Sequence, residues 1–259
     1  MAGMERLLAV AEAAVDAAGA VLRPAFRAGL AAETKADHSP VTEADRGAER
    51  AMRTVLAAAF PDHGLVGEEF GAERPGAALR WVMDPLDGTR AFITGRPSFG
   101  VLLALLHEGR PLLGIIDQPV LRERWVGVAG RQTRFSGPFG GRPGCRPCAT
   151  LAAAELSATS PEMFGPDLPR FQALAARARR TVWGGDCYGY GMLALGFVDV
   201  VAEADLKIWD WAALLPVVEG AGGRLTDWRG AALSEASDGH VLAVGDPALL
   251  GPAVAALAG

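Results

Sequence analysis

The sequence predicts a mixed α and β protein built in two halves, and three observations support this. In the first half, two helical segments precede three strand-length apolar segments with tight connections, which is typical of an antiparallel meander. In the second half, strands alternate with helices, as in an α/β domain. Between them, residues 134–147 are rich in Gly, Pro and Arg and have no apolar period. We therefore expect an N-terminal α+β domain over residues 1–140 and a C-terminal α/β domain over residues 141–259.

The composition restricts the classes of function. The chain has 259 residues, of which 50% are hydrophobic, so it can bury a sizeable core. Its 25 basic and 30 acidic residues give a net charge of −5, which argues against a surface for nucleic acid or anionic membranes. No apolar run is long enough to span a membrane, and the N-terminus does not resemble a signal peptide. We expect a cytoplasmic protein with neither a nucleic-acid nor a membrane partner.

The first half begins with two predicted helices. Residues 5–26 carry apolar side chains at helical spacing, and a polar loop follows over residues 35–40. The loop contains Lys35, and closure of this loop over a substrate is one possibility that the sequence leaves open. A second helix is predicted over residues 42–60. Asp45 lies three residues after Thr42, so it can cap this helix by accepting from the backbone of the first turn.

The strands of the first half end at acidic residues. A short apolar segment over residues 65–67 leads into Glu68 and Glu69, which are either surface residues or include one metal ligand. A longer apolar run begins at Leu79 and predicts a buried strand that stops at Pro85. The meander is then predicted over three further segments: residues 99–107, 112–118 and 124–129.

The second half is predicted as an alternating series. Its strands are expected at residues 155–158, 181–183, 198–202, 224–227 and 241–244. Its helices are expected at residues 168–178, 188–196 and 247–257, with another that begins at Ile208 and closes at the glycine pair 222–223.

Two carboxylates and a glycine turn follow the predicted strand at Leu79. Asp84 and Asp87 are three positions apart and can share a divalent cation. Gly88 permits close approach of the backbone, and a helix that begins near Thr89 would present free N–H groups to a phosphate. The alternative is an ordinary Asp-Gly turn.

The cysteines offer a separate alternative. Cys145 and Cys148 have the spacing of a zinc or redox pair, but no second pair and no nearby histidine completes a zinc site. We expect free thiols in a loop.

Several separated motifs together resemble the inositol monophosphatase superfamily of Mg²⁺-dependent phosphatases. The motifs are Gly67-Glu68-Glu69, Asp84-Pro85-Leu86-Asp87-Gly88-Thr89, Trp209-Asp210 and Glu219-Gly220-Ala221-Gly222-Gly223. The resemblance implies a sugar-phosphatase-like α-β-α-β-α sandwich with the active site between the two halves. It also implies a homodimer.

The same resemblance implies roles for individual residues. Two or three Mg²⁺ ions, or Mn²⁺ in their place, would be bound by Glu68, Asp84, Asp87, Asp210 and the main-chain carbonyl of Leu86. Catalysis would involve Asp45, Thr89 and Glu68, with Asp45 and Thr89 orienting the attacking water. The backbone N–H groups of Gly88 and Thr89 would hold the phosphate of a small-molecule ester. The reaction would be direct attack by a metal-activated water.

Three other segments resemble the histidinol-phosphatase branch, which acts in histidine biosynthesis. They are Arg90-Ala91-Phe92, the end of the meander at residues 116–125, and Gly185-Asp186-Cys187-Tyr188-Gly189-Tyr190. Histidinol phosphate carries an ammonium group, for which Asp186 and Glu203 would be acceptors, and Arg90 is expected in the same pocket. Asp186 has an alternative role as a helix N-cap.

Two other functions remain open at this point. The first is an inositol-1-phosphatase or broad sugar monophosphatase, which shares the phosphate chemistry. The second is a regulatory binding partner of the transcription machinery, which would not need the complete set of metal ligands.

Overall fold

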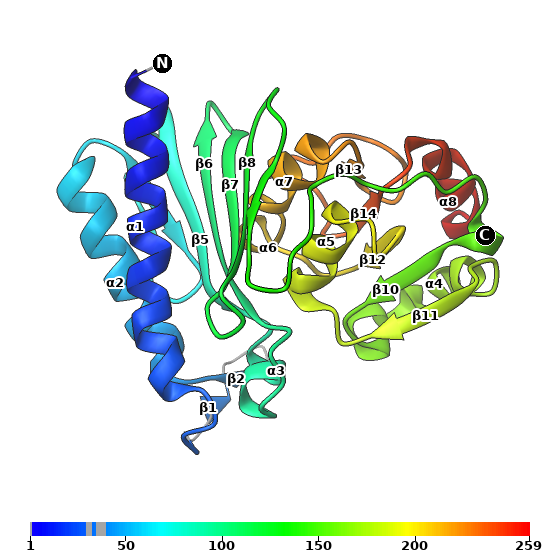
Figure 1. Cartoon of the computed structure of the whole chain (residues 1–259), viewed down its shortest axis with the longest axis horizontal. Coiled ribbons are helices and arrows are strands. Elements are labelled where there is room, and N and C mark those ends of the chain that lie inside the picture. Colours follow the sequence, from blue (N-terminus) through cyan, green and yellow to red (C-terminus); the bar gives the residue numbers. More distant parts are fainter. Residues whose placement is uncertain (1, 30–32, 35–39) are drawn as a thin grey trace.

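The computed structural model describes residues 2–29, 33–34 and 40–259, and its helices and sheets form five layers (Figure 1). Helices α1 (Ala2–Ala25) and α2 (Glu43–Ala59) cover a seven-stranded sheet. A middle layer of α5 (Asp186–Ala194), α6 (Ile208–Trp211) and α7 (Leu214–Gly220) separates it from a five-stranded sheet. Helices α4 (Leu168–Ala175) and α8 (Leu250–Leu257) form the outer layer on the far side. The expected α-β-α-β-α sandwich is therefore confirmed.

The seven-stranded sheet contains the predicted meander. Its strand order is β4-β3-β5-β6-β7-β8-β9, with β3 parallel to β5 and every other neighbouring pair antiparallel. The strands are β3 (Gly64–Gly67), β4 (Gly71–Glu73), β5 (Leu79–Asp87), β6 (Gly100–His107), β7 (Arg110–Gln118), β8 (Glu123–Val128) and β9 (Arg134–Ser136).

Strand β9 lies in a segment for which we expected no regular structure. Its central residue, Phe135, pairs with Trp125 of β8, and their rings lie 4.9 Å apart. This cross-strand aromatic contact stabilises the pairing of the short segment with β8, although its surroundings are rich in glycine.

Strand β5 runs past Pro85, so the prediction that it stops there is wrong. Asp84 pairs with Leu102 and Asp87 pairs with Gly100, and the register shifts between these two pairs. Pro85 lies within this irregular segment, where its missing N–H interrupts no regular ladder. In a regular strand, residues three apart point to opposite faces, so the irregularity also allows Asp84 and Asp87 to point toward the same space.

The five-stranded sheet is mixed. Its order is β11-β10-β12-β14-β13, in which β10 is parallel to both neighbours and β14 is antiparallel to both. The strands are β10 (Glu155–Ala158), β11 (Arg180–Trp183), β12 (Val200–Glu203), β13 (Arg224–Thr226) and β14 (Val241–Val244). All five were predicted, with differences of one or two residues at some ends.

Two helical predictions in this half need correction. The single helix expected from Ile208 to the glycine pair is two helices, α6 and α7. The last helix begins with a 3₁₀ turn, Pro247–Leu249, before α8.

The middle helical layer joins the two halves in one core. Helix α7 lies so close to β7 and β8 that a Cβ on Gly114 would be 2.1 Å from the carbonyl oxygen of Ala213. Trp125 from the first half and Tyr190 and Trp211 from the second half belong to the same buried cluster. The division at residues 140 and 141 stays a prediction, and the two halves share this core.

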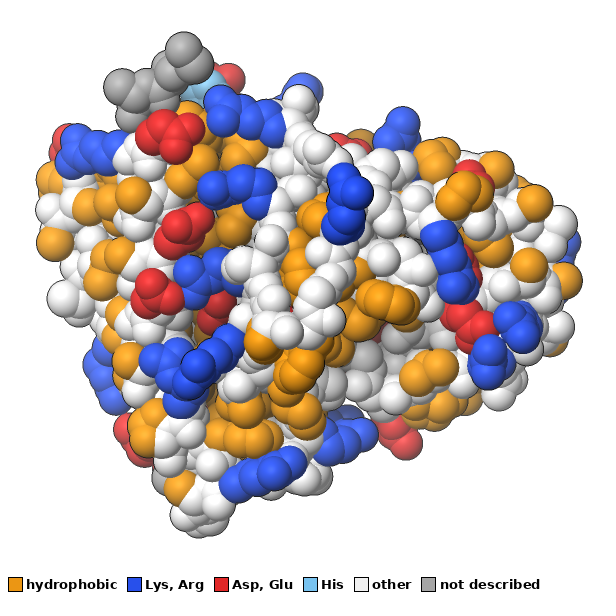
Figure 2. Space-filling model, viewed as in Figure 1, with side chains coloured by type: hydrophobic (Ala, Val, Ile, Leu, Met, Phe, Trp, Pro, Cys, Tyr) orange, Lys and Arg blue, Asp and Glu red, His pale blue; other side chains and the backbone are white. Residues whose placement is uncertain are grey.

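Figure 2 shows basic and acidic side chains mixed over the α1 side of the face in view, and ion pairs Arg124–Asp16 and Arg134–Glu12 link α1 to β8 and β9. No helix in the described part of the chain has the length and apolarity to cross a membrane. Cys145, Cys148 and Cys187 form no disulfide. Residues 35–39 of the predicted loop, which include Lys35, lie outside the described residues.

Candidate active site

A cleft of about 650 Å³ lies between the two sheets and is lined by residues of both halves. From the first half come the end of β5 and the start of α3 (Thr89–Ile93); from the second half come the segments that follow β10 and β12 and the start of α5. The carboxyl ends of strands in α/β sheets commonly form ligand sites, because loops diverge there and leave a crevice. Among the predicted site residues, those lining the cleft are Glu68, Asp84, Leu86, Asp87, Gly88, Thr89, Arg90, Asp186, Glu203 and Asp210.

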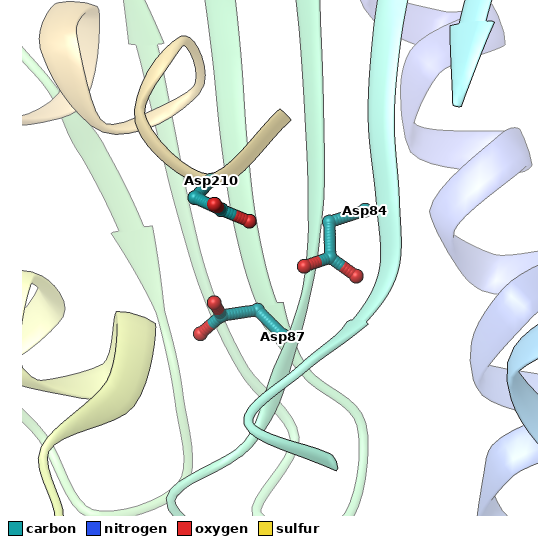
Figure 3. A group of neighbouring side chains, drawn as sticks. All are labelled: Asp84, Asp87 and Asp210. Atoms are coloured by element: carbon teal, nitrogen blue, oxygen red, sulfur yellow. The ribbon is translucent and has the colours of Figure 1, made fainter. Parts of the chain in front are cut away.

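Three of these carboxylates point toward one another (Figure 3). Asp84 and Asp87 come from β5 and Asp210 comes from α6, and each contributes one oxygen to a group whose members all lie within 4.8 Å. The N–H of Leu86 donates to Asp84 at 2.8 Å, the N–H of Cys187 donates to Asp87 at 2.6 Å, and the N–H of Lys207 donates to Asp210 at 2.6 Å. Backbone donors therefore fix all three side chains.

The electrostatics of this cluster favour a bound cation. Burial raises the pKa values of Asp84 and Asp210 well above their usual range, and the charges of neighbouring carboxylates, including Glu68, raise them further. Burial and then the charge of Asp186 raise the pKa of Asp87 to about 7, although the Cys187 hydrogen bonds oppose this. A divalent cation would remove the repulsion, and an oxygen-only donor set suits Mg²⁺. The residues present therefore fit the metal that the resemblance implies.

The turn that follows Glu68 is held by two residues that the sequence did not single out, Glu49 and Arg53. Buried Glu49 of α2 accepts from the N–H groups of Glu69 at 2.7 Å and Phe70 at 3.2 Å, and Arg53 binds Glu49 at 2.8 Å. A Cβ on Gly67 would lie 2.0 Å from the Glu49 carboxylate, so glycine is required where this carboxylate approaches. The sequence signal for this contact was the pair Glu49 and Arg53, two opposite charges four residues apart on the buried face of a predicted helix.

Asp45 caps α2 and also contacts Thr89. Its carboxylate accepts from the N–H of Thr42 at 2.9 Å, which completes the predicted capping box. Its other oxygen accepts from the Thr89 hydroxyl at 3.2 Å. Thr89 lines the cleft and begins α3, after Gly88 at a φ of 85°. A single carboxylate therefore links the helix terminus to the hydroxyl at the cleft.

Asp186 does not act as the N-cap of α5, so that alternative is wrong. It is the first residue of α5, and its carboxylate accepts from the Ser98 hydroxyl at 3.0 Å. Its φ of 43° is a left-handed conformation that is uncommon for residues other than glycine. It packs against the glycine turn, because a Cβ on Gly88 would lie 2.9 Å from Asp186 Cγ.

The charge of Asp186 is partly balanced by its surroundings. Burial raises its pKa, while the hydrogen bond from Ser98 and the positive charges of Arg96 and Arg90 oppose the rise. Arg90 is exposed at the rim of the cleft rather than inside the carboxylate cluster.

Glu203 is buried at the end of β12 and accepts from two hydroxyl groups that were not foreseen from the sequence. Thr159 donates to Oε1 at 2.5 Å and Tyr190 donates to Oε2 at 3.0 Å. Burial raises the pKa of Glu203 to about 8, despite these hydrogen bonds. A cation bound beside Glu203 would lower this pKa again, because it favours the charged form.

We expect the stability of the metal-free protein to fall as the pH rises from about 5 to about 7.5. In the unfolded state, the side chains of aspartate and glutamate ionise near pH 4. In the folded state, Asp87 keeps its proton to about pH 7 and Glu203 keeps its proton to about pH 8. The folded state then binds more protons than the unfolded state, so the free energy of unfolding decreases with pH. Scanning calorimetry in EDTA should show a Tm lower by about 5–10 °C at the upper pH. Saturating Mg²⁺ should restore most of the Tm that is lost at the upper pH. A pH dependence of Tm that is the same with and without Mg²⁺ would contradict a metal site here.

The comparisons with known proteins agree with this arrangement. The model of the inositol monophosphatase family matches residues 3–256. A bifunctional phosphatase of Arabidopsis thaliana, IMPL2 (chloroplastic), is 45% identical over 230 residues, which are 88% of this chain and 66% of the relative, so the chain spans slightly under two thirds of that protein. The histidinol-phosphatase of Chlorobaculum parvum is 39% identical over 216 residues, 79% of this chain and 78% of the relative.

A solved structure gives the same result for the fold. The structure described as an inositol monophosphatase from Zymomonas mobilis superposes with a TM-score of 0.89 at 48% identity, and 98% of each chain is covered. The match over nearly the whole chain, the layered fold and the carboxylate cluster lead to one conclusion. The chain belongs to the inositol monophosphatase family and is a phosphoric monoester hydrolase.

Proposed function

We propose that the protein is a Mg²⁺-dependent histidinol-phosphate phosphatase. The observation that carries this proposal is the position of Asp186 beside Gly88, at the turn assigned to phosphate. In histidinol phosphate the ammonium group is attached one carbon from the ester carbon, so an anion beside the phosphate site suits this substrate. The similarity to histidinol-phosphatase supports the same choice.

The cleft residues have distinct proposed roles. Two or three Mg²⁺ ions, or Mn²⁺ in their place, would be held by Glu68, Asp84, Asp87, Asp210 and the Leu86 carbonyl. When bound, these ions neutralise the phosphate oxygens, lower the pKa of water and stabilise the leaving alkoxide. The N–H groups of Gly88 and Thr89 bind the phosphate.

The proposed reaction transfers the phosphoryl group directly to water. Thr89 holds the attacking water and Asp45 orients the Thr89 hydroxyl through their hydrogen bond. Glu68 completes the catalytic set as a ligand and as a negative charge near the water. Isolation of a phosphorylated residue from quenched enzyme would contradict this mechanism.

Specificity is proposed to come from two carboxylates at different depths. Asp186 lies beside the phosphate turn, and Glu203 is buried in the wall of the cleft. Hydrogen bonds from an ammonium group to such carboxylates contribute about 1.5–3 kcal/mol each. Arg90, at the rim, is proposed to attract the substrate phosphate. Inositol phosphates have no cation for these acceptors, which disfavours the inositol or broad sugar monophosphatase alternative.

We expect kcat/KM with Mg²⁺ to be at least about a hundredfold higher for histidinol phosphate than for inositol 1-phosphate. Glu203→Gln and Asp186→Asn should each lower kcat/KM for histidinol phosphate about 10- to 100-fold, with a smaller effect on inositol 1-phosphate. Asparagine is the appropriate replacement for Asp186 because it tolerates a positive φ, which alanine does not. Equal kcat/KM values of the wild type for the two esters would contradict this specificity and would indicate a general monophosphatase.

Three further attributes stay predictions. Homodimer formation rests on the family resemblance, and a cytoplasmic location rests on composition. A role as a partner of the transcription machinery is less well supported than catalysis, because every carboxylate predicted to bind metal lines the cleft.

A further inference from the structure

Two residues with no role assigned so far hold the Glu203 carboxylate. Thr159 follows β10 and Glu203 ends β12, and these strands are parallel neighbours. Their register pairs Ser157 with Val201, so two residues further on Thr159 lies opposite Glu203. Tyr190 reaches the same carboxylate from α5. Thr159, Tyr190 and Glu203 all line the cleft.

The Thr159 hydroxyl has a fixed direction. It accepts from the N–H of Asp186 at 3.0 Å and lies 2.5 Å from Glu203 Oε1. A backbone N–H can only donate, and a hydroxyl has a single proton, so the Thr159 proton is directed at Glu203 when that group is ionised. Thr159 therefore connects the backbone of one proposed ammonium acceptor to the side chain of the other.

Tyr190 fixes the second oxygen. Its hydroxyl donates to Glu203 Oε2 at 3.0 Å, and its side chain is almost fully buried. Burial, followed by the charge of Glu203, raises the pKa of the phenol well above its usual value, so Tyr190 remains a donor. Each carboxylate oxygen then receives one hydrogen bond and keeps a free acceptor position for a ligand.

The backbone of Asp186 needs such support. At a φ of 43° an aspartate is in a sparsely populated conformation, and its N–H and its carboxylate are both bound, by Thr159 and Ser98 respectively. Loss of the Thr159 hydroxyl would release the N–H of Asp186 and one oxygen of Glu203 together.

We propose that Thr159 and Tyr190 are positioning residues that set the specificity of the cleft for a substrate with an ammonium group beside its phosphate ester. The inference rests on the proposed function, since it assigns these hydroxyls to the support of Glu203 and Asp186. Both hydroxyls act through those carboxylates and do not take part in phosphoryl transfer.

The test compares variants that remove only a hydroxyl. With histidinol phosphate, Thr159→Val should raise KM about tenfold and Tyr190→Phe about threefold to tenfold, with kcat within about threefold of wild type. KM for β-glycerophosphate, which lacks an ammonium group, should change by less than about threefold. Thr159→Ser retains the hydroxyl and should restore KM. Tyr188→Phe is the matched control, because Tyr188 lies on the same helix but donates to Glu123.

The outcomes separate this inference from the proposed function. A wild type that does not prefer histidinol phosphate to inositol 1-phosphate would overturn the proposed substrate and this inference with it. If the wild type does prefer it, equal KM increases for both esters, or no recovery in Thr159→Ser, would overturn the inference alone. Tyr190→Phe keeps the buried ring and provides the test if Thr159→Val does not fold.

Discussion

Replacement of Asp87 by asparagine should lower kcat/KM by about a thousandfold or more while the fold is retained. Asp87 is one of the three carboxylates that converge in Figure 3, and asparagine lacks the charge that a divalent cation requires. A loss of about 4 kcal/mol of transition-state stabilisation corresponds to this factor. The measurement is phosphate release from histidinol phosphate and from β-glycerophosphate at saturating Mg²⁺, so that the result does not depend on the substrate assignment.

The same variant should be at least as stable as the wild type in EDTA at pH 7.5. Its amide oxygen can still accept from the N–H of Cys187, and a buried repulsive charge is absent. Asp246→Asn is a suitable control, because Asp246 caps a 3₁₀ turn far from the carboxylate cluster in sequence and asparagine also caps well. Full activity of Asp87→Asn at saturating metal would exclude this cluster as the catalytic metal site.

Replacement of Thr89 by valine should lower kcat about a hundredfold, with KM changed little. The hydroxyl contacts Asp45 and the Leu86 carbonyl, each at 3.2 Å, and valine keeps the shape while removing the group proposed to hold water. Positioned proton-handling groups commonly contribute factors of about 10² to 10⁴. Steady-state kinetics at saturating Mg²⁺ separate kcat from KM.

Two control variants test whether the loss of kcat is specific to the Thr89 hydroxyl. Thr89→Ser keeps the hydroxyl and should retain activity within about tenfold of wild type. Thr94→Val removes the hydroxyl of another threonine at the end of the same helix, where it donates to the carbonyls of Arg90 and Ala91, and should leave kcat unchanged. A Thr89→Val enzyme with normal kcat would rule out the proposed role in water orientation.

The features that could be read from the sequence are those whose causes lie within a few residues. The capping box of α2 needs only Thr42 and Asp45, three residues apart. Asp84, Asp87, Gly88 and Thr89 lie within six consecutive positions. The alternation of helices and strands in the second half follows local apolar periods. The family resemblance then extended these motifs to Asp210, which no local pattern connects to β5.

The errors in the prediction arise from contacts with distant parts of the chain. Pro85 was expected to end a strand, because proline cannot donate to a regular ladder. The structure accommodates it by a register shift against β6, and that shift depends on the partner strand rather than on β5 itself. Asp186 was compatible with a helix cap from its position alone, but Ser98, 88 residues earlier, binds its carboxylate instead.

By itself the sequence determined the types of element and the chemistry of the motifs, because periodicity, capping and turn formation act between neighbours along the chain. Only the tertiary structure decided which distant residues meet. Glu49 and Arg53 support the turn at Glu68, and Thr159 joins Asp186 to Glu203. These contacts depend on strand order and register, which are set by the packing of both sheets against the middle helices, and that packing energy is a property of the whole core rather than of any one segment.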